Sequence, residues 1–413
     1  MIGTGVFTSM GYQLSDIQST FSLMMLWIIG GIISLSGVLC YAELSTALPR
    51  SGGEYHLLSY SLHPSIGFAA GIVSATVGFT APAVVSAILL GEYISRMYPM
   101  FDQASVTFVV ITGLHLIHMS TVRSGLRFQD SFTAIKIFII MVFIVFGFFI
   151  DKPQSISLLP SVGDLNIILS SSFATNLVWV LYAYTGWNSV IYISGEIKNP
   201  KLNISKAMLF STCFVMILYV LLNYVFLYTT PINLMEGKPD FAYIVGTEIF
   251  GEIGAELIGL SIAVILLSTI SSYVYIGPRI IQIMGEDHEI IKFFKLKNNK
   301  QIPINAFGFQ LCLAYLFIFT SRLEQIVVCT SISLIITTTL TIITLFVLRI
   351  KEPKLYRPYK VWGYPFTPSI FLIINFYILY NTFADKTIES LIGIAIFLAG
   401  VLLHFFSSKP NKI

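Results

Sequence analysis

Uninterrupted apolar stretches long enough to cross a lipid bilayer recur along almost the whole of this sequence. A helix needs about 20 apolar residues to span the hydrocarbon core, and short polar segments separate these stretches. They lie near residues 21–44, 65–97, 104–120, 128–150, 169–194, 204–230, 252–277, 305–320, 326–349, 366–384 and 388–407. Their apolar residues are continuous and do not alternate with period two, which argues against a β-barrel. The sequence therefore predicts an all-α polytopic membrane protein.

The composition agrees with membrane residence and favours few other kinds of chemistry. Only 11% of the 413 residues are charged, too few to cover a soluble globule of this size. The four cysteines lie singly in apolar stretches and the six histidines are dispersed. We therefore expect no metal site, disulfide or cofactor, and no enzyme constellation. The basic residues are scattered in loops, so we expect no nucleic-acid partner.

The distribution of lysine and arginine predicts the orientation in the membrane. Loops on one side hold most of the basic residues, namely Arg50, Arg123, Arg127, Lys198, Lys201, Lys206, Arg279 and the clusters 292–300 and 349–360. The opposite loops hold Arg96, Lys152, Lys238, Arg322 and Lys386. The basic side should be cytoplasmic. If a short first helix over residues 1–10 counts as a crossing, twelve crossings of the plasma (inner) membrane place both termini in the cytoplasm.

Two of the apolar segments carry glycines and polar residues that suggest interrupted helices. Gly3 and Gly5 lie two positions apart, so they do not share a helix face, and Thr4 adds a hydroxyl between them. In the segment 169–194, Thr185, Gly186 and Asn188 occur at mid-depth, where polar side chains are costly unless they line a cavity. Close helix packing is the alternative for the first segment, and an unbroken helix with satisfied hydroxyls for the second.

The spacing of the two interrupted segments predicts an internal repeat. The second interrupted segment comes five spans after the first, which favours a 5+5 inverted repeat, with a first repeat over about 1–150 and a second over about 165–349. Two extra helices over about 366–407 complete a single transmembrane domain of residues 1–413. Unwound backbone offers N–H groups to a carboxylate and carbonyl groups to an ammonium ion. A zwitterionic amino acid satisfies both.

These segments resemble the signatures of a known family. Gly3-Thr4-Gly5-Val6-Phe7 and Tyr184-Thr185-Gly186-Trp187-Asn188 are similar to the helix-one and helix-six motifs of the amino acid-polyamine-organocation (APC) superfamily, in its L-type branch of transporters. Further motifs that agree are Tyr41-Ala42-Glu43-Leu44, Ser51-Gly52-Gly53, Gly195-Glu196-Ile197-Lys198-Asn199-Pro200, Gly277-Pro278-Arg279 and Tyr356-Arg357-Pro358-Tyr359. The resemblance covers nearly the whole chain.

The resemblance implies a LeuT-like fold that works by alternating access, with substrate held between helices one and six. Backbone N–H groups of Thr4, Gly5 and Val6 would bind the substrate carboxylate, and carbonyl groups near the two breaks would accept from its amino group. Tyr182 would form an aromatic lid. The implied substrate-binding residues are Ile2, Gly3, Thr4, Gly5, Val6, Tyr182, Ala183, Tyr184, Thr185 and Gly186.

Lys136 is the one basic residue deep within the span of Phe132 to Phe149. Snorkelling to the interface is one interpretation. By the resemblance, Lys136 instead replaces the sodium ion of sodium-coupled relatives and contacts the backbone of helix one. The carrier would then be sodium-independent, with coupling to protons or to a counter-substrate.

The expected function is transport of neutral amino acids, because the residues named for the pocket include no acid. Two alternatives are an amino acid sensor with a transporter fold and a cationic amino acid or polyamine antiporter. Glu43 and Glu54 flank the loop at Ser51-Gly52-Gly53, as gate residues or as solvated interfacial charges. A surface ion pair is expected for Glu92 and Arg96, four residues apart.

The first helix would be only about half a span long, since it ends before Gly11-Tyr12-Gln13. The family has a cytoplasmic tail and an inner half-helix before the glycine motif. We therefore expect the gene product to begin some 20–40 residues upstream, with about 10 of them completing the helix.

Overall fold

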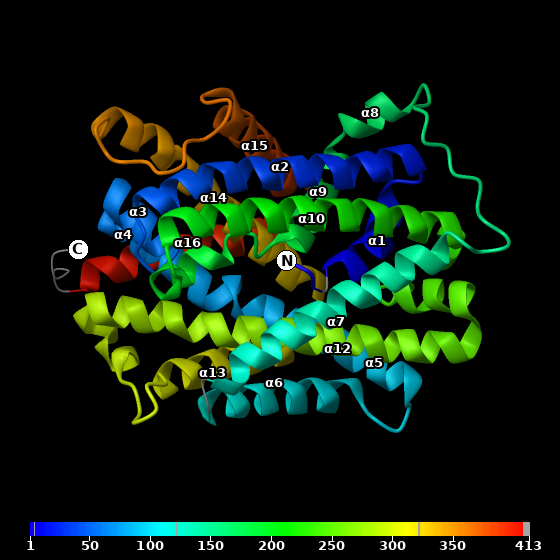
Figure 1. Cartoon of the computed structure of the whole chain (residues 1–413), viewed down its shortest axis with the longest axis horizontal. Helices are drawn as coiled ribbons and strands as arrows, with labels where there is room; N and C mark the ends of the chain where they lie inside the picture. Colours follow the sequence, from blue (N-terminus) through cyan, green and yellow to red (C-terminus); the bar gives the residue numbers. More distant parts are fainter. Residues whose placement is uncertain (4, 121–122, 321–322, 408–413) are drawn as a thin grey trace.

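The computed structural model describes residues 1–3, 5–120, 123–320 and 323–407. The described residues form helices and contain no strand, and most of the helices run along the longest axis of the molecule (Figure 1). In chain order they are α1 (Gly5–Asp16), α2 (Thr20–Ala47), α3 (Glu54–Ser61), α4 (Pro64–Val73), η1 (Ser74–Gly78), α5 (Thr80–Met97), α6 (Gln103–Ser120), α7 (Arg123–Gly147), α8 (Asp164–Ile168), α9 (Ser171–Tyr184), η2 (Ser189–Glu196), α10 (Pro200–Thr229), α11 (Ile232–Met235), α12 (Phe241–Asp287), η3 (Glu289–Lys295), α13 (Ile304–Thr320), α14 (Leu323–Lys351), α15 (Phe366–Asp385) and α16 (Thr387–Phe406).

The prediction of a polytopic membrane protein is confirmed. Within the described residues, eight helices are long and apolar enough to cross a membrane, and two further apolar helices are shorter. Large apolar side chains lie on the outside, for example Phe149, Phe210 and Phe405. Such side chains are accommodated among lipid tails at little free-energy cost, whereas their exposure to water is unfavourable.

The long span predicted over 65–97 is not one regular α-helix. It consists of α4, the single π-turn η1 and α5, and the Phe79 N–H donates to Ser74 O at 3.1 Å in the π pattern. Pro82 has no N–H to donate to the Gly78 carbonyl, so the regular ladder is interrupted here.

The first helix differs from its prediction at both ends, because α1 begins at Gly5 and continues through Gly11 to Asp16. Gly11 lies where another chain segment approaches closely: a Cβ built on it would meet Lys238 O at 2.1 Å. The Gly237 N–H also donates to Gly11 O at 2.8 Å. Gly11 therefore serves helix packing and does not end the helix.

The helix predicted over 252–277 spans residues 241–287 in the structure. It has a kink at Gly251, and Pro278 lies within it. Proline within a membrane helix is tolerated where other groups satisfy nearby carbonyls. Here Gln310 Nε2 donates to Tyr273 O at 3.2 Å, and the Arg279 guanidinium donates to Tyr275 O. The prediction that this helix ends at residue 277 is therefore wrong.

Each face of the bundle carries an ion pair that joins two elements. We call the face where α2, α12 and α14 end the basic face and the opposite one the α8 face; they lie at the left and right of Figure 1. On the basic face Arg50 binds Asp287 at 2.8 Å. On the α8 face Arg96 pairs with Asp240 and lies over the Tyr243 ring, so the ion pair expected between Glu92 and Arg96 is replaced by one with another helix.

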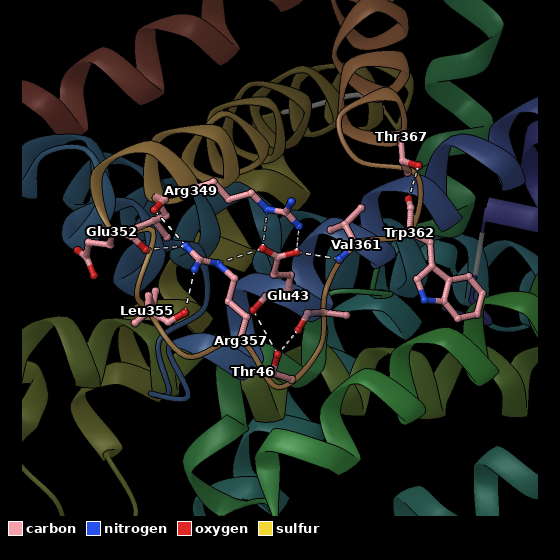
Figure 2. Close-up of polar contacts among 11 residues, drawn as sticks. Glu43, Thr46, Arg349, Glu352, Leu355, Arg357, Val361, Trp362 and Thr367 are labelled. Atoms are coloured by element: carbon pink, nitrogen blue, oxygen red, sulfur yellow. Dashed lines mark hydrogen bonds and ion pairs between the residues drawn. The ribbon is translucent and has the colours of Figure 1, made fainter.

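Glu43 and Glu54 are both buried, which contradicts the solvated interpretation. Glu43 is 1% exposed and its carboxylate is the centre of the cluster in Figure 2. Arg349 donates to both oxygens at 2.9 and 2.6 Å, Arg357 Nε lies 3.2 Å from Oε1, and the Val361 N–H donates to Oε2 at 2.7 Å. The cluster fastens the linker between α14 and α15 to the end of α2.

A buried histidine on the basic face gives a stability prediction. His288 follows α12, is buried, and lies 3.1 Å from Ser407 Oγ through Nδ1, with its ring centroid 4.8 Å from that of Phe68. Burial, together with the charge of His404, lowers its pKa to about 4. The unfolded chain, with an ordinary pKa of about 6.5, binds the proton first. Stability from this group is therefore complete above pH 6.5 and is lost as the pH falls towards 4.

We expect acidification from pH 7.5 to 5 to cost wild type about 2 kcal/mol through His288. The His288→Gln variant should lose correspondingly less over the same interval. Thermal unfolding in detergent at both pH values measures the difference, with His63→Gln as the control because His63 is exposed. Parallel pH dependences of wild type and His288→Gln would contradict the prediction.

Candidate functional site

The apolar segment 169–194 is broken where the sequence predicted a break. Helix α9 ends at Tyr184 and η2 starts at Ser189, while Thr185 has extended backbone angles, φ −52° and ψ 151°. Gly186 has φ +96°, a conformation that favours glycine. The alternative of an unbroken helix is therefore wrong. The ends of α9 and η2 leave backbone groups without intrahelical partners.

The start of α1 contacts this break directly. A Cβ on Gly5 would lie 2.3 Å from Ala183 Cα, so only glycine allows α1 and α9 to approach this closely. Thr4 lies outside the described residues. Because α1 begins here and α9 ends here, the positive end of one helix dipole adjoins the negative end of the other. This pair of ends is suited to a zwitterion.

Lys136 connects three elements at the same level. It is 5% exposed, and its Nζ donates to Ile2 O at 3.2 Å and to Thr269 Oγ1 at 2.9 Å. The Lys136 side chain thus joins α7 to the segment before α1 and to α12. The snorkelling interpretation is wrong for this structure, because the ammonium group points inward.

Tyr219 of α10 also bridges the two breaks, and the sequence reasoning missed it. Its hydroxyl lies 2.8 Å from Met1 O and 3.2 Å from Ala183 O. Its ring packs edge-on against Trp27 at 5.8 Å. The available signal was a phenol group in the middle of the apolar segment 204–230.

A cavity of about 290 Å³ adjoins the break on the side of the basic face. It lies between α7, α10, α12 and the start of η2, and the described residues that line it include no carboxylate. Its polar lining consists mainly of hydroxyl groups and the Lys136 ammonium group. The lining residues are Met1, Ile2, Thr133, Lys136, Ile137, Gly186, Ser189, Ser211, Phe214, Val215, Thr269, Ser272, Tyr273 and Ile276.

The structure brings only some of the predicted substrate-binding residues to this cavity. Ile2 and Gly186 line it, whereas Tyr182 and Thr185 line a second cavity of about 50 Å³ between α2, α9, α14 and α15. The Tyr184 side chain is buried with its hydroxyl 3.4 Å from Trp27 O. Val6 is buried, Ala183 is buried against Gly5, and Gly3 lies against Thr269. The lid role of Tyr182 stays a prediction.

Towards the α8 face, the site is closed by packing of α1 on α9. The Tyr12 and Trp179 rings stack with centroids 4.5 Å apart, and Ser9 Oγ donates to Trp179 O at 3.2 Å. The 290 Å³ cavity lies beyond the break from this contact.

In a comparison with known protein families, the family model described as amino acid permease matches residues 1–407 of this chain. The chain belongs to the amino acid permease family. It is 27% identical to the serine/threonine exchanger SteT of Bacillus subtilis, over 99% of this chain and 94% of that protein. It is 24% identical to b(0,+)-type amino acid transporter 1 of Rattus norvegicus, over 98% and 84% of the two chains.

A third relative is large neutral amino acids transporter small subunit 2 of Mus musculus, 24% identical over 98% of this chain and 78% of that protein. The resemblance to an APC superfamily permease is therefore confirmed. Amino acid transport is the activity of this permease family, and the relatives are transporters and exchangers. This favours a carrier over an enzyme.

Proposed function

We propose that this permease exchanges neutral amino acids across the plasma membrane by alternating access, without sodium. Twelve crossings arranged as a 5+5 inverted repeat plus two helices would place both termini and the basic face in the cytoplasm. The amino acid would bind between the start of α1 and the break after α9.

The meeting of the two helix ends supports an α-amino acid as substrate. The first turn of α1 presents N–H groups of Gly5 and Val6 that have no intrahelical acceptor, and these suit a carboxylate. The last turn of α9 presents carbonyl groups that suit an ammonium group. One substrate with both charges satisfies both ends.

The cavity lining supports a neutral side chain. A cationic substrate would need a carboxylate to offset its charge in a site of low dielectric, and the described lining has hydroxyls and the Lys136 cation instead. Two of the relatives are named for serine and threonine and for large neutral amino acids. Hydroxyl groups at Thr133, Ser189 and Ser272 favour small or hydroxylated side chains.

The position of Lys136 is the observation that carries sodium independence. Its ammonium group already supplies a positive charge to Ile2 O and Thr269 Oγ1, the kind of oxygen ligands that would otherwise coordinate a hard cation. A second cation beside it would be repelled. Coupling would then come from a counter-substrate or from protons.

Exchange in proteoliposomes tests the proposal. Vesicles loaded with unlabelled serine should take up labelled serine, and replacing sodium by choline outside should leave the rate unchanged. Unlabelled alanine or leucine should compete, and arginine should not. A sodium requirement would overturn the coupling, inhibition by arginine alone would favour the cationic antiporter, and binding without uptake would favour a sensor.

A second prediction concerns the bridge between the breaks. Tyr219→Phe removes the hydroxyl that holds Met1 O and Ala183 O and should lower the exchange rate about three- to tenfold, as expected for one buried hydrogen bond. Tyr224→Phe on the same helix is the control, because the Tyr224 ring stacks on Phe148 and Tyr228. Equal exchange rates of the two variants would contradict a role for the Tyr219 hydroxyl.

A further inference from the structure

Glu54 is a buried acid for which the transport site described above has no use. It is the first residue of α3 and is 0% exposed. The chain enters α3 through Gly52 and Gly53, which have φ +120° and +59°. A Cβ on Gly53 would lie 2.2 Å from the Tyr192 ring, so this loop is pressed against η2. The loop geometry directs Glu54 into the protein.

The two oxygens of the Glu54 carboxyl group have different surroundings. Oε1 accepts from Tyr41 Oη at 2.6 Å and from Asn188 Nδ2 at 3.1 Å. Oε2 is buried, and no described group donates a hydrogen bond to it. This asymmetry matches a neutral carboxylic acid, in which Oε1 is the carbonyl that accepts and Oε2 carries the hydrogen.

The groups that face the carboxyl from the neighbouring elements carry no positive charge. Among the described residues they are Tyr41 of α2, Asn188 just before η2, Tyr192 of η2, and Thr337 of α14. Thr337 already donates to Leu334 O at 3.0 Å, and the Tyr192 hydroxyl shares a hydrogen bond with Ser74 at 3.0 Å. The Thr337 oxygen can therefore accept a hydrogen from Oε2, and either oxygen can donate in the pair between Tyr192 and Ser74.

Glu43 and Glu54 differ in whether a positive charge lies beside the buried carboxyl group. Both glutamates are buried near the basic end of α2, but Glu43 binds two arginines, whereas no ion pair among the described residues involves Glu54. A buried carboxylate without a cation costs several kcal/mol. A proton removes that cost. Arginine thus neutralises Glu43, whereas the described partners of Glu54 are neutral.

Glu54 is placed to respond to movement of the broken helix. Its partner Asn188 lies between Trp187, whose ring is 4.7 Å from that of Tyr41, and Ser189, which lines the 290 Å³ cavity. Displacement of η2 would remove the Asn188 donor and bring Glu54 closer to water in the cavity. The protonation state and the position of η2 are therefore linked.

We propose that Glu54 is a proton-binding site that must be occupied for the broken helix to complete the transport cycle. The proton comes from water at the basic face, resides on Oε2 in this conformation, and returns to water when the carboxyl group ionises. The proposal rests on the exchange function proposed above. It predicts a carrier that slows as the proton is lost at high pH.

Infrared spectroscopy tests the proton directly, without transport. In purified wild type at neutral pH, the difference spectrum against Glu54→Gln should show loss of a carboxylic-acid C=O band. The difference against Glu252→Gln should show loss of carboxylate bands, because Glu252 is exposed on α12. Loss of carboxylate bands in Glu54→Gln would overturn the proposal.

The pH profile of exchange tests the coupling. Above the pKa of a single required proton, the wild-type rate should fall up to about tenfold per pH unit. Glutamine keeps the shape of the neutral acid, so the exchange rate of Glu54→Gln should vary by no more than about twofold over the same pH range. The pH profile of Glu252→Gln should follow that of wild type. A wild-type profile in Glu54→Gln, or a folded but inactive variant at every pH, would overturn it. If wild type shows no exchange, the transport proposal fails, and the infrared result still decides whether Glu54 carries a proton.

Discussion

Replacing Lys136 by methionine should reduce amino acid exchange at least about 100-fold, because it removes two hydrogen bonds from a charged donor, each worth about 1.5–3 kcal/mol. The ammonium group holds Ile2 O at 3.2 Å and Thr269 Oγ1 at 2.9 Å, and so fixes the segment before α1 against α12. Methionine is unbranched like lysine, one heavy atom shorter, and apolar, which suits burial. The initial rate of labelled serine exchange in proteoliposomes measures the loss.

Two variants separate the charge of Lys136 from its hydrogen bonds. Thr269→Val removes one partner and leaves the ammonium group bound to Ile2 O, so we expect a loss of about tenfold. Lys136→Arg keeps the charge with a different geometry and should not restore the wild-type rate. If the Lys136→Met variant exchanges serine at a rate near wild type, the role proposed for this lysine is wrong.

Replacing Glu43 by glutamine should destabilise the protein by about 3–5 kcal/mol, the cost of breaking a buried ion pair from one side. The change leaves Arg349 and Arg357 without a carboxylate, and the Arg357 side chain is only 8% exposed. The linker at Val361 loses its anchor as well. The loss of stability is measured by thermal unfolding in detergent, with size-exclusion chromatography as the readout of folded protein.

Glu324→Gln is the matched control for Glu43→Gln, because it also removes the carboxylate from an ion pair between a glutamate and a basic residue. Glu324 binds Lys386 at 2.8 Å, but the two side chains are 46% and 39% exposed. An exposed pair contributes about 0–1 kcal/mol, so the control should melt close to wild type. Equal melting temperatures of Glu43→Gln and Glu324→Gln would contradict the prediction.

The broken helix could be predicted because its signal is local. Thr185, Gly186 and Asn188 are costly at mid-depth in any membrane helix, whatever lies around them. Gly11 and Pro278 carried the same kind of signal and misled, because neighbouring groups accommodate both residues within continuous helices. Whether a glycine or proline ends a helix depends on what approaches it from elsewhere in the chain.

The partners of the charged residues could not be predicted. Glu43 and Glu54 are eleven positions apart and look alike in the sequence, yet one meets Arg349 and Arg357, more than 300 residues away, and the other meets Tyr41 and Asn188. Tyr219 became a candidate only when its hydroxyl was found between Met1 O and Ala183 O. Such contacts join segments whose separation in sequence carries no distance information.

By itself, the sequence determined membrane residence, the helical class, the family motifs and the place of the break after Tyr184, because the bilayer imposes length and polarity on each span separately. Only the tertiary structure decided which side chains face the cavity, that Lys136 points inward to Ile2 O, and that Tyr182 and Thr185 line a different cavity. In lipid, apolar faces hardly discriminate between neighbours, so the close packing of small residues and a few polar contacts set the arrangement of the helices.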